Sequence, residues 1–310
     1  MPQPKVKLVV TGDDFGYCPK RNQGIVDCFQ AGGISNVSLL VNASSAKEAT
    51  ELAKRHHIPI GLHANLSEGL PVSQGLKRGS TLLNKDGFFH GKMGFRKALQ
   101  SGLVNMTEVE LELRAQVRLF GELMGYLPCH MDGHQHIHVL PGMIKSVKNK
   151  FSFTTTANQK AKGLLRGRRL GLYINIYKYR TKHTSRQERQ HNTAWPDVYL
   201  GLTTMGHNMS VPNLRRAFSH ALERDLNVSL SPPGGESKNR TNTTEQPVLT
   251  AELMVHPGYP SHPQEGGCGE GPDDFSQSAD RQQELTTLKD PALLAFYTQE
   301  RVQLCAFRDL

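Results

Sequence analysis

The segment HMDGHQHIHV, residues 130–139, places five groups able to bind metal or protons at alternate positions: His130, Asp132, His134, His136 and His138. In an extended chain, side chains two residues apart lie on one face, so this spacing predicts that all five groups point the same way. An apolar interior cannot hold five such groups without polar partners. The segment therefore predicts a site for a metal ion, water or substrate hydroxyls. Gly133 and Pro141 indicate that the chain curls outward, so that only part of the set reaches the centre.

Similar groups follow other apolar runs of the sequence. Asp13 and Asp14 follow KVKLVVT, His63 lies in IPIGLHANL, and His256 follows LTAELMV. Imidazole and carboxylate are ligands of borderline and hard divalent ions, and three protein ligands with an open position are typical of a catalytic metal. Adjacent carboxylates can also divide the work, because one can bind the metal while the other accepts a proton from water.

Each of these residues has a structural alternative when it is taken alone. A lone buried histidine such as His63 is more often part of a hydrogen-bonded core, and Asp13 and Asp14 could occupy a helix cap or a turn. The histidine-rich segment could be a surface loop. Cys18 and Cys129 lie near the candidate groups, but cysteine is often a small buried hydrophobe. Joint placement at successive strand ends favours a functional site.

Alternating patterns along the chain predict the elements that position these groups. Strands are expected at 5–11, 36–42, 58–66, 130–138, 198–204, 249–260 and 301–306, and helices at 22–31, 44–57, 107–124, 211–223 and 278–289. A Gly- and Pro-rich loop is expected over 68–94. Alternating strands and helices favour a parallel sheet, open or closed into a barrel. In such folds catalytic groups lie where strands end and loops begin.

Composition narrows the class of protein. The 310 residues contain five cysteines without a Cys-x-x-Cys pair, which argues against a disulfide framework or a thiolate zinc site. No run of 18 apolar residues occurs and the N-terminal apolar run is short, so we expect an intracellular, cytoplasmic protein that does not span a membrane. The net charge of +9 is concentrated in the basic segment 143–190, whereas 231–247 is polar and is expected to be a flexible surface insertion.

Five segments in this order resemble the YdjC-like carbohydrate deacetylases: VVTGDDFGYCPKRNQGI, SNVSLLVN, GLHANLSEG, HMDGHQHIHVLPG and ELMVHPGYP. The resemblance runs through nearly the whole chain and implies an α/β fold, an irregular, TIM-barrel-like (β/α) barrel that forms a single domain over 1–310. It implies a hydrolase that acts on the amide C–N bond of acetylated sugars. It also implies a divalent metal, with Mg²⁺ expected and Zn²⁺ as the alternative.

The resemblance also suggests a role for each matching residue. Asp13 corresponds to the general base, and Asp14, His63 and His134 correspond to the metal ligands. His256 is similar to a late histidine that protonates the leaving amine or holds the acetyl group. The remaining candidates would support the ligands or face the substrate: Asp132, His136 and His138, with His136 also a reserve third ligand.

Other functions remain compatible with the same residues. Asp and His ligands could serve a phosphoester hydrolase, and the basic segment would suit a phosphate. A non-catalytic carbohydrate-binding protein is a second alternative, and a nucleic-acid-binding protein is a third, although nucleic acid is not the expected partner. The expected partner is an acetylated carbohydrate, and a homodimer is compatible with the sequence.

Overall fold

The computed structural model describes residues 4–140, 143, 173–174, 196–230 and 248–310. Within them, one sheet of eight strands has the order β5-β4-β3-β2-β1-β7-β6, and β8 also pairs with β1. All recorded pairings are parallel. The strands are β1 (Val6–Phe15), β2 (Asn36–Leu39), β3 (Ile60–Ala64), β4 (His130–Gly133), β5 (Tyr173–Ile174), β6 (Val198–Leu200), β7 (Leu249–Val255) and β8 (Val302–Leu304).

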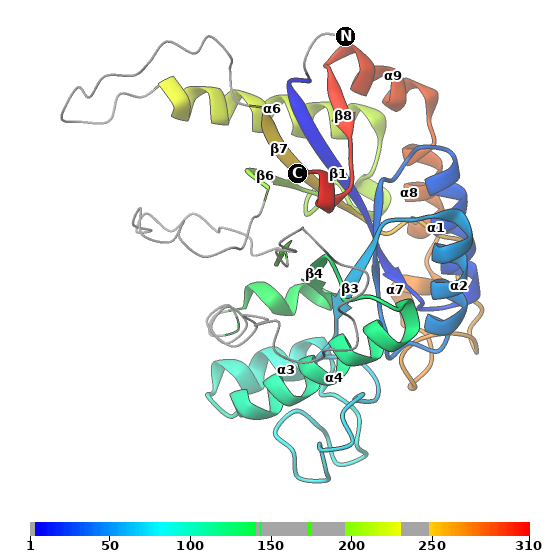
Figure 1. The fold of residues 1–310 in the computed structure, drawn as a ribbon, viewed down its shortest axis with the longest axis vertical. Coiled ribbons are helices and arrows are strands. Elements are labelled where there is room, and N and C mark those ends of the chain that lie inside the picture. Colours follow the sequence, from blue (N-terminus) through cyan, green and yellow to red (C-terminus); the bar gives the residue numbers. More distant parts are fainter. Residues whose placement is uncertain (1–3, 141–142, 144–172, 175–195, 231–247) are drawn as a thin grey trace, which may run out of the picture.

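Helices surround this curled sheet (Figure 1). They are α1 (Pro19–Gln30), α2 (Ala46–His56), α3 (Gly91–Gln100), α4 (Met106–Met124), α6 (Val211–Leu230), α7 (Asp274–Gln277), α8 (Asp280–Leu288) and α9 (Pro291–Gln299), with 3-10 helices η1 (His134–Val139), η3 (Gly206–Asn208) and η4 (Phe307–Asp309). Among the described residues no pairing joins the end strands β5 and β6, so the sheet forms a half-barrel. The α/β class and the irregular barrel predicted from the sequence are confirmed.

Local sequence explains where the helices begin and end. The Asn105 side chain accepts a hydrogen bond from the backbone N–H of Thr107 at the start of α4, which satisfies a donor that the helix leaves unpaired. Gly125 closes the same helix in a left-handed conformation, with φ of 86°, which glycine adopts without penalty. Asp290 and Pro291 start α9 in the same manner, with a side-chain cap followed by proline at the first turn.

The two faces of the sheet differ in chemistry. Side chains on one face are apolar and pack against the helices: Leu8, Val10, Val37, Leu39, Leu62, Met131, Leu253 and Val255. Each buried Leu or Val contributes about 1.5–3 kcal/mol. The register pairs Thr11 with Asn36 and His63 with Asp132, so the opposite face collects the polar side chains. These interior residues are all buried: Thr11, Asp13, Asn36, Ser38, His63, His130, Asp132 and Glu252.

A close approach in this interior requires glycine. A Cβ atom at Gly61 would overlap the His130 ring, so only glycine on β3 lets that ring lie against the strand. The ring also stacks on Phe307 of η4, with centroids 4.3 Å apart. Val9, Cys305 and Phe307 form a small apolar cluster beside it. The interior is therefore polar toward the strand ends and is closed by apolar groups at the other end.

The prediction that residues 130–138 are extended is wrong beyond Gly133. The strand ends there and η1 begins, with Gln135 and His136 in the left-handed region at φ of 52° and 60°. Only His130 and Asp132 therefore share a strand face. The five groups do not face one way, because the turn redirects His134, His136 and His138 separately.

Other differences are smaller. The predicted loop over 68–94 overlaps the start of α3, and α3, α7 and α9 were not predicted. The predicted insertion 231–247 and nearly all of the basic segment 143–190 lie outside the described residues. No helix in the described part of the chain is both long and apolar enough to cross a membrane.

Candidate active site

The end of β1 brings two adjacent carboxylates to the same place. Asp13 lies two residues after Thr11 and shares its interior face, whereas regular pleating would turn Asp14 the other way. The pairing register between β1 and β2 shifts between Gly12 and Phe15, and Asp14 has a φ of 62°. Aspartate tolerates this left-handed conformation better than most residues. The irregularity therefore turns Asp14 toward the same histidines that Asp13 approaches.

Three strand ends supply one group of donor atoms. Asp14, His63 and His134 each offer a ligand atom within 4.8 Å of the others. Asp14 Oδ1 lies 3.4 Å from His63 Nε2 and 3.0 Å from His134 Nδ1. The two rings meet edge to face with centroids 5.4 Å apart. One carboxylate and two imidazoles therefore converge on one point.

A second group overlaps the first. Asp13, His63 and Asp132 also lie within the same mutual distance of 4.8 Å. Asp132 Oδ1 accepts a hydrogen bond from His63 Nδ1 at 2.6 Å, which leaves His63 Nε2 facing Asp13 and Asp14. Ser38 donates its hydroxyl to the other oxygen of Asp132 at 2.5 Å and contacts His130 Nε2 at 3.0 Å. Asp132 thus orients His63 and is itself held from behind.

Charge in this buried space is unevenly distributed. Burial raises the pKa of Asp13 well above its ordinary value, despite the favourable charge of His63. Burial opposes ionisation of Asp14 too, but hydrogen bonds from His134 and His63 hold its pKa well below the usual range. Burial likewise disfavours a charged His134, yet hydrogen bonds to Asp14 and Glu68 raise its pKa to about 9. The neighbouring carboxylates therefore attract positive charge to this point.

His256 approaches the pair from β7. Its Nε2 lies 3.9 Å from Asp13 Oδ2, and its Nδ1 lies 3.9 Å from Glu284 Oε1. Burial holds the pKa of His256 well below its ordinary value, so the ring is neutral at neutral pH. Glu284 also accepts the backbone N–H of His256 at 2.5 Å.

Two buried arginines complete this scaffold. Arg21 and Arg281 both donate to the carbonyl oxygen of His256, at 3.3 and 3.1 Å. Arg281 lies 3.3 Å from Glu284 Oε1, and Arg21 Nη1 lies 3.7 Å from Asp14 Oδ2. The segment carrying His256 is therefore anchored through its backbone.

The residues fit a divalent cation. The donor set of one carboxylate and two imidazoles is one that such ions accept. Asp13 Oδ1 is buried and has no hydrogen-bond partner among the described residues, which is costly in a site without a compensating group. Several carboxylates packed around two imidazoles also favour a bound positive charge.

The structure brings Asp13, Asp14, His63, Asp132, His134 and His256 into one cluster. His136 and His138 belong to neither donor group found in the described part of the chain, although burial lowers their pKa values to about 4 and about 3. Five supporting residues were not predicted from the sequence: Arg21, Ser38, Glu68, Arg281 and Glu284. Of these, only Ser38 could have been predicted from the sequence, because its spacing of two residues from Asn36 places both side chains on one face of a strand.

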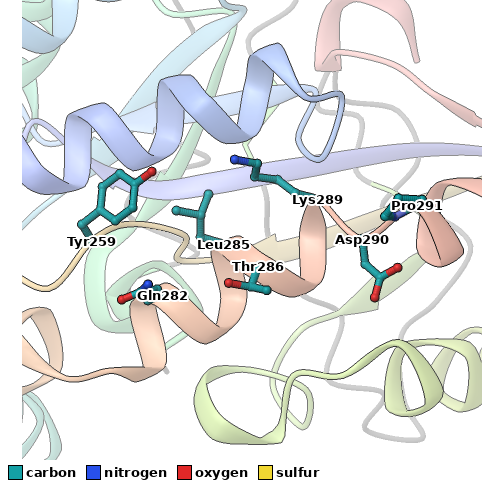
Figure 2. A pocket seen from close by; sticks show the side chains of 7 residues that line it. All are labelled: Tyr259, Gln282, Leu285, Thr286, Lys289, Asp290 and Pro291. Atoms are coloured by element: carbon teal, nitrogen blue, oxygen red, sulfur yellow. The ribbon is translucent and has the colours of Figure 1, made fainter.

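A cavity elsewhere does not share these residues. It has a volume of about 520 Å³ and runs along α8 to the start of α9, as Figure 2 shows. Its lining is Tyr259, Gln282, Leu285, Thr286, Lys289, Asp290 and Pro291. None of these side chains belongs to the carboxylate and histidine cluster, so the chemistry is not assigned to this cavity.

Comparison with known proteins identifies the family. The sequence model described as YdjC-like protein matches residues 7–299. The chain belongs to the YdjC-like family. A carbohydrate deacetylase of Danio rerio is 60% identical to this YdjC-like chain over 318 residues, covering 100% of both sequences. A carbohydrate deacetylase of Homo sapiens is 43% identical, covering 100% of this chain and 93% of the human protein.

More distant relatives extend the comparison. A chitooligosaccharide deacetylase of Yersinia pestis is 27% identical over 221 residues, covering 71% of the YdjC-like chain and 78% of the bacterial protein. A solved structure from Enterococcus faecalis V583, provisionally described as a cellobiose-phosphate cleavage protein, has a TM-score of 0.68 at 18% identity and covers 98% of both chains. At this low identity, the likeness to the Enterococcus structure supports the fold and not the activity.

Proposed function

We propose that this chain is a metal-dependent carbohydrate deacetylase that hydrolyses the N-acetyl group of N-acetylglucosamine-containing oligosaccharides. The observation that carries the proposal is the meeting of Asp14, His63 and His134 within 4.8 Å, with Asp13 beside them. Relatives named carbohydrate deacetylase and chitooligosaccharide deacetylase support the substrate class. The reaction is hydrolysis of an amide C–N bond, which releases acetate and a free amino sugar.

Asp14, His63 and His134 are the residues that would hold the metal. A divalent cation bound there would act as a Lewis acid that polarises the acetyl carbonyl, and it would lower the pKa of nearby water. The resemblance of the sequence pointed to Mg²⁺, which prefers an all-oxygen shell. Two imidazoles in the donor set favour a borderline ion such as Zn²⁺. Both ions therefore belong in the test.

Asp13 acts as the general base in this proposal. Its pKa is raised by burial, which brings a carboxylate closer to the range useful for proton transfer at neutral pH. It takes a proton from water as the water oxygen bonds to the acetyl carbon. Asp13 returns that proton to the sugar nitrogen as the C–N bond breaks. The acetic acid formed loses its remaining proton to solvent.

His256 assists without carrying the proton. The ring is neutral because burial lowers its pKa, so it is a poor initial proton donor. Its Nε2 lies 3.9 Å from Asp13 Oδ2, close enough for a substrate atom to contact both. We assign it to hold the acetyl group by hydrogen bonding, the second of the two roles that the sequence suggested.

The experiment measures acetate release from N-acetylglucosamine oligosaccharides by the purified protein. It is run with EDTA, then with Mg²⁺ or Zn²⁺ restored, and with the Asp13→Asn variant alongside. Release that depends on metal and is lost in the variant supports the proposal. Phosphate release from a sugar phosphate without acetate release, or no acetate release from folded and metal-loaded protein, would overturn it.

A further inference from the structure

One hydroxyl group joins three loops beside the site. Tyr17, just after β1, is buried and donates to Glu68 Oε1 at 2.8 Å. The backbone N–H of Asp273, in the loop before α7, donates to the same hydroxyl at 2.9 Å. The other oxygen of Glu68 lies 2.8 Å from His134 Nε2. A continuous chain therefore runs from Asp273 through Tyr17 and Glu68 to His134.

The direction of these hydrogen bonds follows from the donors available. A backbone N–H can only donate, so the Tyr17 oxygen accepts from Asp273 and its single proton is free for Glu68. Burial raises the pKa of Tyr17, and the charge of Glu68 raises it further, so that the phenol keeps this proton. Glu68 then has its second oxygen available for the N–H at His134 Nε2.

This arrangement determines which ring nitrogen of His134 faces Asp14 and His63. With Nε2 engaged by Glu68, Nδ1 is the atom directed at Asp14, 3.0 Å away. His63 presents the opposite nitrogen, because its Nδ1 is engaged by Asp132 and its Nε2 faces Asp14. The ring nitrogen not facing a metal is the one that a supporting carboxylate holds in many metal sites.

We propose that Tyr17 and Glu68 are positioning residues that fix the His134 ring so that Nδ1 is presented to the metal. The inference rests on the proposed function, since it concerns the metal of that same site. Its parallel is the Ser38–Asp132 pair behind His63, where a hydroxyl also donates to a carboxylate that holds an imidazole. Strand residues hold the His63 ring, whereas loop residues hold the His134 ring.

The two series of hydrogen bonds differ in burial. The Glu68 side chain is 13% exposed, against 4% for Asp132. Loops carry Tyr17, Glu68 and Asp273, so the fixed sheet register does not set their spacing. The Tyr17 hydroxyl adds a constraint on the Glu68 carboxylate itself, because it contacts both that carboxylate and the backbone N–H of Asp273. Its removal should loosen His134 while leaving the strands intact.

The test uses Tyr17→Phe and Glu68→Gln in the full chain. Tyr259→Phe is the matched control, because it also removes a phenol that donates to a carboxylate at 2.7 Å, but between the loop after β7 and Asp27 of α1. Calorimetry measures the Zn²⁺ affinity of metal-free protein, and Co²⁺ absorption reports ligand geometry. Acetate release gives kcat and KM, and circular dichroism checks folding.

We expect Glu68→Gln to bind Zn²⁺ about 10–100-fold more weakly and Tyr17→Phe several-fold more weakly, with altered Co²⁺ spectra and an unchanged KM. Tyr259→Phe should match the parent. Unchanged Zn²⁺ affinity with a raised KM in Glu68→Gln would make Glu68 a substrate contact and overturn the inference. If Glu68→Gln does not fold, the affinity of Tyr17→Phe decides. If the variants bind Zn²⁺ more weakly than the parent but the parent itself releases no acetate, the proposed function is overturned and the positioning role of Tyr17 and Glu68 is not.

Discussion

Asp132 and His63 stand opposite each other in the sheet register and are joined by a hydrogen bond of 2.6 Å. The backbone pairing that holds β3 to β4 therefore also aligns the carboxylate with the imidazole. His63 is buried, and the charges of Asp132 and Asp13 outweigh that burial and raise its pKa well above the ordinary value. The fold itself sets the orientation of this ring.

The Asp132→Asn substitution tests that relationship. The amide keeps the shape of the side chain but removes the charge that favours His63, so we expect Zn²⁺ affinity and kcat/KM each to fall about 10–100-fold. Ser38→Ala is the companion variant, and it should lose about 1–3 kcal/mol of stability because it leaves buried polar atoms unpaired. Calorimetry and urea denaturation measure the two effects. An Asp132→Asn protein with parental metal affinity would contradict the orienting role.

The adjacent carboxylates should separate cleanly by mutation. Asp13→Asn should retain the metal and lower kcat by about 10²–10⁴-fold, because it removes the proton acceptor. Asp14→Asn should lose both metal and turnover, and asparagine is chosen because it tolerates the left-handed backbone at this position. His134→Ala should behave like Asp14→Asn. Metal content by elemental analysis, alongside acetate release, checks the assignment, and a fully active, metal-replete His134→Ala would refute it for that ligand.

The buried scaffold under His256 should be costly to break. Glu284 and Arg281 are 3.3 Å apart and their side chains are fully buried, so Glu284→Ala leaves an uncompensated charge and should cost about 3–5 kcal/mol. Glu51→Ala is the control, since the Glu51–Lys54 pair at 3.3 Å is exposed and should contribute about 0–1 kcal/mol. Urea denaturation measures both variants. Equal midpoints for the two would show that the Glu284 pair contributes no stability.

His130 should make stability depend on pH. Burial lowers its pKa to about 4 from an ordinary 6.5, so the unfolded chain binds a proton that the folded chain excludes. Stability from this group is present above pH 6.5 and is lost as pH falls toward 4, with a total of about 3 kcal/mol. His130→Gln should therefore flatten the fall in urea stability between these values, whereas His207→Gln, at an exposed site, should not. Parallel pH profiles for parent and His130→Gln would disprove the assignment.

Sequence patterns predicted that the candidate residues lie close to the carboxyl ends of strands, but they did not predict the path of the chain beyond those ends. The apolar runs before Asp14 and around His63 form parallel strands whose carboxyl ends meet at one edge, so those residues had to be close. The alternating pattern after His130 looked like a continuous strand. Period-two spacing carries no information on the left-handed turn at Gln135 and His136, which ends it.

Supporting residues were harder to predict for a physical reason. Glu68 and Arg21 lie within the segments quoted from the sequence, but on a loop and a helix whose spatial neighbours the spacing does not specify. Glu284 lies 28 positions from His256 and reaches it only because the fold brings α8 against the segment that follows β7. A metal ligand can be predicted from the type of residue at a strand end, whereas the residues that support it depend on tertiary packing, which the spacing does not specify.

The central strand gives the molecule a particular order of assembly. Val6 of β1 pairs with Leu249 of β7 and with Val302 of β8, positions separated by most of the chain. Pairings of such long sequence separation are slow to form, because a long loop must close before any contact is gained. Phe307, which closes the interior under His130, follows β8 directly. We therefore expect Asp13 and Asp14 to be made early on the ribosome, and their buried, polar surroundings to be completed only when the last strand docks.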